Sequence, residues 1–76
     1  MITIGEQRVR MDFNVSGDSE IDNFKKLSAE LINKLEDMKN KQSFESVNHN
    51  EYGRLIALAQ TAYEEACMWA VKAITI

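Results

Sequence analysis

Two long stretches of the chain place apolar residues at the three- and four-residue steps of an amphipathic helix. The first covers about residues 19–39 and has Ser19 as its expected N-cap. Its apolar stripe consists of Ile21, Phe24, Leu27, Leu31, Leu35 and Met38. The second covers about residues 50–75, and its stripe has the spacing of a coiled-coil seam. That stripe consists of Tyr52, Ile56, Ala59, Tyr63, Ala66, Ala70 and Ala73. A polar connection between the two stretches predicts an antiparallel hairpin of two helices.

The segment before the first helix, residues 1–18, has a different pattern. Short runs such as Ile2–Ile4 and Val9–Met11–Phe13 alternate apolar and polar positions, and Gly5 and Gly17 are typical of turns. Because it is too short for a sheet, we expect an extended segment that lies against the helices.

Composition supports a single small all-α domain over residues 1–76. The sequence has no proline and three glycines, and 45% of its residues are hydrophobic. Beside the seam of the second helix runs another apolar stripe, made of Leu55, Leu58, Ala62 and Trp69. One partner helix covers only one stripe, so we expect a helical homo-oligomer, with Trp69 as an anchor of the core or of an interface.

Charge and motifs exclude several functions. The net charge of −3 argues against binding of DNA or of an anionic membrane. Cys67, with a single histidine in the chain, cannot form a Cys/His zinc site, and we expect it to be a small core residue. Glu64 and Glu65 are adjacent and cannot face each other as an acid/base pair on a helix. We therefore expect no catalytic residues, no metal and no cofactor.

The basic residues near the start of the chain form a candidate ligand site. Arg8 and Arg10 share one face of the expected extended segment, Phe13 follows them, and Lys25 and Lys26 come one to two turns into the first helix. Cations suit phosphate groups, and an aromatic ring suits a base, so together they would fit a nucleotide. The alternative is that these are ordinary solvated charges and that Phe13 is packed in the core.

Most of the chain resembles the helical hairpin shared by two phage sponge families, the second anti-CBASS protein and the first anti-Thoeris protein. The C-terminal features that carry the resemblance are Arg54, Ala59-Gln60-Thr61, Glu64-Glu65 and Met68-Trp69-Ala70 followed by Lys72. The N-terminal features are Arg8-Val9-Arg10, Phe13-Asn14-Val15-Ser16-Gly17 and Ile21-Asp22-Asn23-Phe24-Lys25. The short chain is more similar to the anti-CBASS sponge, because the anti-Thoeris sponge carries an additional β-rich part.

The resemblance implies a hexamer that sequesters cyclic dinucleotides, and in some members cyclic trinucleotides, without cleaving them. It implies a phosphate-contacting lysine, matched by Lys25 with Lys26 beside it, and a base-stacking aromatic, matched by Phe13. It also implies an arginine for trinucleotides, matched by Arg54, whereas Gln60 stands where other members have a basic residue.

The expected setting is the cytoplasm of an infected bacterium. A different class of function is also open, namely a small oligomeric scaffold or antitoxin-like hairpin that binds a host protein through its apolar second helix. A hydrolase of cyclic nucleotides would need a base and usually a metal, which the sequence does not indicate.

Overall fold

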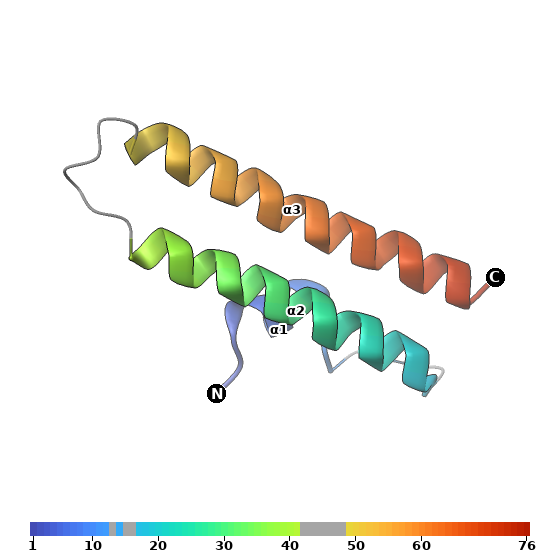
Figure 1. Cartoon of the computed structure of the whole chain (residues 1–76). Coiled ribbons are helices and arrows are strands. Elements are labelled where there is room, and N and C mark those ends of the chain that lie inside the picture. Colours follow the sequence, from blue (N-terminus) through green and yellow to red (C-terminus); the bar gives the residue numbers. More distant parts are fainter. Residues whose placement is uncertain (13, 15–16, 42–48) are drawn as a thin grey trace.

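The computed structural model is all-helical over the residues that it describes, which are 1–12, 14, 17–41 and 49–76. Two long helices, α2 (Ser19–Asn40) and α3 (His49–Ile74), run antiparallel side by side (Figure 1). A short helix, α1 (Ile4–Val9), lies against them. The molecule is flat, with extents of 47 × 25 × 12 Å. The all-α hairpin is confirmed, and the helices expected over residues 19–39 and 50–75 correspond to α2 and α3.

The expectation of an extended segment over residues 1–18 is wrong for Ile4–Val9, which form α1. This helix begins with a capping box. The Glu6 N–H donates to the Thr3 hydroxyl at 3.1 Å, and the Thr3 N–H donates to the Glu6 carboxylate at 2.9 Å. Six residues are too few for a helix that is stable alone, so α1 depends on its contacts with the hairpin.

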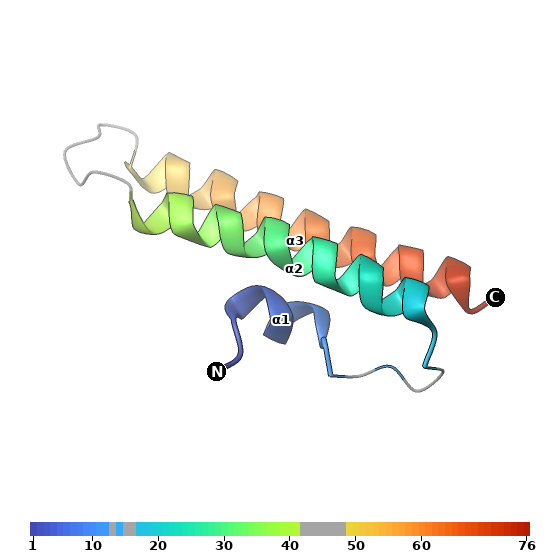
Figure 2. The same cartoon turned by 60° about the horizontal axis from the view of Figure 1, so that its bottom comes forward.

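Gly5 allows α1 to approach α2 closely (Figure 2). The Gly5 N–H donates to the side-chain oxygen of Asn33 at 2.7 Å, and the Asn33 amide donates to the Thr3 hydroxyl at 3.0 Å. A Cβ atom on Gly5 would overlap the backbone carbonyl of Ala29. The start of α1 is therefore fixed to the middle of α2 by a contact that a larger residue cannot make.

The core lies where the three helices meet. It consists of Val9, Ala29, Ile32 and Cys67, with Met11 and Val71 packed against it. The expectation that Cys67 is a core residue is confirmed, since its exposed fraction is 4%.

The buried face of α2 is not the predicted stripe. Of that stripe Ile21 is buried, whereas Phe24, Leu27, Leu31 and Met38 are 38–49% exposed. The helix is instead rotated so that its buried residues are Ile21, Lys25, Ser28, Ala29 and Ile32. The small Ser28 and Ala29 let neighbouring helices approach α2 there.

The N-cap of α2 and the seam of α3 also differ from expectation. Asp18, not Ser19, is the N-cap, and its carboxylate accepts a hydrogen bond from the Glu20 N–H at 2.8 Å. Of the seam expected in α3, Ile56 is buried, and the other buried positions are Gln60 and Cys67.

Gln60 is a buried polar residue between the two long helices. Its amide donates to the Ile32 carbonyl at 3.2 Å and to the Glu36 carboxylate at 3.0 Å. The bond from Gln60 lowers the pKa of Glu36 below its usual value of 4.5, while burial opposes that shift and Lys39 adds to it. This pair links α2 to α3 in a fixed register.

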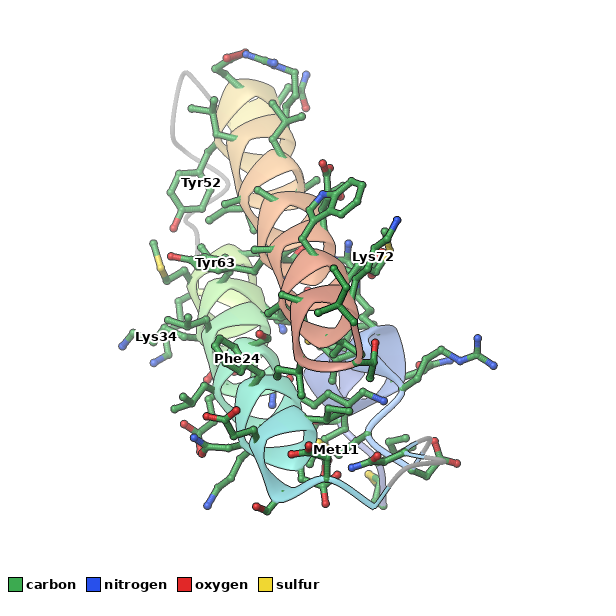
Figure 3. The ribbon with its side chains drawn as sticks, turned by 90° about the vertical axis from the view of Figure 1, so that its right-hand side faces the viewer. Met11, Phe24, Lys34, Tyr52, Tyr63 and Lys72 are labelled. Carbon is green, nitrogen blue, oxygen red and sulfur yellow. The ribbon has the colours of Figure 1, made fainter. Side chains whose placement is uncertain are left out.

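One long side of the hairpin, away from α1, carries a row of apolar side chains, most of which are exposed. Phe24, Tyr52 and Tyr63 lie on this side in Figure 3, and the charged, exposed Lys34 lies on the same side. Helical spacing places four further residues of α2 beside Phe24. We call the whole set the open face: Phe24, Leu27, Leu31, Leu35, Met38, Tyr52 and Tyr63. No member carries a charge. Among the described helices, none is both long and apolar enough to cross a membrane.

Candidate functional site

A pocket of about 350 Å³ lies where α1, the N-terminal half of α2 and the C-terminal half of α3 meet. Its lining is Arg8, Val9, Arg10, Lys25, Glu64, Cys67, Met68 and Val71. The structure therefore brings together three of the basic residues that the sequence singled out, Arg8, Arg10 and Lys25. Arg8 lies in α1, Arg10 is the C-cap of α1, and Lys25 lies in α2.

Lys25 is the most buried of these cations, with an exposed fraction of 6%. Its ammonium group donates a hydrogen bond of 2.9 Å to the Arg10 carbonyl at the end of α1. A buried ammonium group requires such a partner, and a carbonyl at a helix C-terminus carries partial negative charge. Lys25 thus supplies positive charge to the pocket and also holds α1 in place.

Arg10 ends α1 in the left-handed conformation, with φ 57° and ψ 57°. Glycine adopts this backbone without cost, whereas another residue loses about 1 kcal/mol. The Arg10 N–H bonds back to the Gln7 carbonyl at 3.2 Å, and the residue, which is exposed, is part of the pocket lining.

Arg8 connects α1 to α3 across the pocket wall. Its Nε donates to Glu64 Oε1 at 2.8 Å, and a terminal nitrogen donates to the Thr61 hydroxyl at 3.2 Å. Both side chains of the ion pair are partly exposed, Arg8 to 23% and Glu64 to 37%. The guanidinium group is therefore oriented, but it remains accessible to a ligand.

Three other candidate residues lie elsewhere. Lys26 is exposed and does not line the pocket, because neighbouring residues on a helix point about 100° apart. Arg54 forms an ion pair with Glu51 near the start of α3, about 15 Å along the helix from Glu64 at 1.5 Å per residue. Phe13 lies outside the described residues, so its expected stacking role stays a prediction.

The part of the chain that the structure describes holds no group of three or more potential metal ligands. Gln60, at the position where the resemblance implies a basic residue in other members, is buried between α2 and α3 and does not line the pocket. Its two hydrogen bonds give it a structural role.

A family model for the Acb2/Tad1 hairpin domain matches residues 4–75. The chain belongs to this family. No curated protein and no solved structure gives a significant match. The match to the Acb2/Tad1 hairpin domain includes α1, both long helices and every residue that lines the pocket. The resemblance to the phage sponge families is therefore confirmed.

Sequence reasoning missed the contribution of α3 to the pocket of this Acb2/Tad1 hairpin. Glu64, Cys67, Met68 and Val71 recur at three- and four-residue steps, which places them on one face of the helix. That spacing could have indicated from the sequence that these residues share a face. The ion pair between Glu64 and Arg8 could not be predicted in this way, because the two residues are 56 positions apart in the sequence.

Proposed function

We propose that this chain is a phage counter-defence protein that binds cyclic dinucleotide second messengers and sequesters them without cleavage in the cytoplasm of the infected host. By removing the messenger it would block CBASS-type immune signalling. Cyclic trinucleotides are a further ligand class within the same proposal. The observation that carries it is one pocket with Arg8, Arg10 and Lys25 in its wall, in a chain of the Acb2/Tad1 hairpin family.

The electrostatics of the pocket support a phosphate ligand. Arg8 and Arg10 present guanidinium groups, which bind phosphate oxygens through paired hydrogen bonds, and Lys25 adds an ammonium group with little access to water. Against the overall charge of −3, this is a local concentration of positive charge. It favours a small anion over a long polyanion.

Apolar side chains complete the pocket. Val9, Met68 and Val71 offer a surface against which a base can pack, and methionine sulfur contacts aromatic rings favourably. A volume of about 350 Å³ is near the lower end of the range for small-molecule pockets, roughly 300–1,000 Å³. We therefore propose that each ligand is shared between two copies of the chain.

The open face supports a homo-oligomer, which we propose is the hexamer implied by the resemblance. Phe24, Leu27 and Leu31 are each more than two-fifths exposed, although they lie along one side of a 22-residue helix. An exposed apolar strip of this length on so small a protein is typical of an interface between chains, and Lys34 lies on the same side. The pocket lies on the other side of the hairpin, beside α1, so sharing a ligand requires a second interface there. A cyclic dinucleotide has approximate twofold symmetry, and a twofold interface at the pocket would present the same cations to both phosphates.

Native mass spectrometry of the purified protein with cyclic dinucleotides tests the proposal. We expect ligand retained at fixed stoichiometry, and heating should release it intact, which separates sequestration from hydrolysis. Lys25→Met should weaken binding at least tenfold, since a charged hydrogen bond is worth about 1.5–3 kcal/mol. Lys26→Met removes the same charge from the adjacent exposed position and is the matched control. Equal binding by both variants would contradict the assignment of the pocket.

The second candidate is a scaffold or antitoxin-like hairpin that binds a host protein. The outer surface of α3 favours it, because Leu55, Leu58 and Trp69 are each more than half exposed. The same measurement separates the two functions: a scaffold would retain no cyclic nucleotide.

A further inference from the structure

Glu64 is an acidic residue in the wall of a pocket whose other charged groups are cations. A carboxylate beside a phosphate site repels the ligand unless it meets a hydrogen-bond donor. Its bond to Arg8 gives one reason for its presence, because it orients the guanidinium group. That bond leaves most of the carboxylate unused.

The Glu64 carboxylate can accept more hydrogen bonds than Arg8 donates to it. A carboxylate offers two oxygens and about four acceptor positions. Arg8 Nε bonds to Oε1, and the terminal nitrogen of Arg8 turns to Thr61 instead of bonding to Oε2. Within residues 1–12, 14, 17–41 and 49–76, Glu64 has Arg8 as its hydrogen-bond partner. Oε2 is therefore available at a side chain that is 37% exposed.

The surroundings of Glu64 suit a base. Cys67, Met68 and Val71 follow it on the same face of α3 and line the same pocket. The pocket thus combines cations from α1 and α2 with a carboxylate and apolar side chains from α3. A phosphate group of the ligand would lie next to the cations, which attract its negative charge. A base packed on the apolar side chains of α3 would lie next to the carboxylate.

We propose that Glu64 makes this pocket selective for guanine over adenine. The inference rests on the proposed function and specifies the ligand of the same site. Guanine has two adjacent N–H donors on its Watson–Crick edge, at N1 and at the exocyclic N2, and a carboxylate accepts both. Adenine has a donor at N6 next to an acceptor at N1, which a carboxylate repels. Cyclic dinucleotides that contain guanine are therefore the favoured ligands.

Isothermal titration calorimetry with cyclic di-GMP and cyclic di-AMP tests this selectivity. The unmodified protein should bind cyclic di-GMP at least tenfold more tightly, as expected for one extra hydrogen bond to a charged group. Glu64→Gln keeps an oxygen for Arg8 and replaces the other with an NH₂ donor. Its ratio of the two affinities should fall at least tenfold.

Glu65→Gln is the matched control, because it makes the same change of charge at the adjacent residue, which is exposed and does not line the pocket. It should leave the ratio unchanged. If Glu64→Gln changes both affinities by the same factor, Glu64 acts through Arg8 or through net charge, and the inference is wrong. Equal binding of both ligands by the unmodified protein would also overturn it, while the proposed function would stand. Binding of neither ligand would instead contradict the proposed function.

Discussion

The ammonium group of Lys25 donates a hydrogen bond of 2.9 Å to the backbone carbonyl of Arg10, and both residues line the same pocket. Lys25 thus holds the backbone of Arg10 in place. Substitution of Lys25 removes a charge and also loosens the end of α1, so its effect on ligand binding must be measured together with the helical content of the variant.

Arg10→Gly separates stability from binding. Glycine adopts the left-handed backbone at this position freely, so the free energy of unfolding should rise by up to about 1 kcal/mol. The pocket loses a cation, so affinity for cyclic dinucleotides should fall. Urea unfolding and calorimetry measure the two effects. A variant that is less stable and binds normally would show that the Arg10 side chain acts in folding alone.

Gly5→Ala tests the contact between α1 and α2. The added methyl group would overlap the Ala29 carbonyl, and overpacking of this kind costs about 1–3 kcal/mol. We expect a lower midpoint of thermal unfolding and loss of ligand binding, because α1 carries Arg8 and Arg10. Gly53→Ala is the control: nothing lies within 4 Å of its added atom, and alanine in a helix stabilises by about 0.5–1 kcal/mol. Similar melting of the two variants would contradict the close contact at Gly5.

Leu31→Glu tests assembly through the open face. Leu31 is 43% exposed in the single chain, so the hairpin should keep its helical content. A charge in an apolar interface should prevent oligomerisation, which analytical ultracentrifugation would detect as a fall in mass. Glu30→Gln changes the neighbouring exposed position, about 100° round the helix, and should assemble normally. An assembled Leu31→Glu variant would exclude the open face as the interface.

The protonation of Glu36 makes the stability of the hairpin depend on pH. Its pKa is lowered in the folded chain, so the unfolded chain binds protons more readily. The stabilisation is complete above the usual value of 4.5 and is lost as the pH falls through the lowered pKa. Glu36→Gln should therefore lose less stability than the unmodified protein when the pH drops from about 5 to about 3. Glu6 and Glu51, whose pKa values are also lowered, are present in both proteins. Parallel stability curves would contradict the prediction.

Much of the fold could be predicted because α2 and α3 are long and regularly patterned. The helix α1 was missed because six residues give too few repeats to distinguish a helix from an alternating strand. Thr3 and Glu6 did carry the spacing of a capping box. The buried face of α2 could not be predicted, because Lys25 and Ser28 are buried by tertiary contacts that override their polarity.

The candidate site was predicted in part. The sequence grouped Arg8, Arg10 and Lys25 by chemistry, and the fold brings them to one pocket. It could not separate Lys25 from Lys26, because only the rotation of α2 decides which of them faces inward. Glu64 was weighed as a catalytic acid and not as a partner of Arg8, since that pairing depends on the docking of α1.

The dependence of α1 on its neighbours has a consequence for the order in which the protein matures. Arg8 and Arg10 leave the ribosome more than fifty residues before Glu64, yet six residues cannot hold a helix alone. The pocket that Arg8 and Glu64 line therefore cannot form before α3 has been translated. A nascent chain that still lacks α3 has no complete pocket and should therefore bind no ligand.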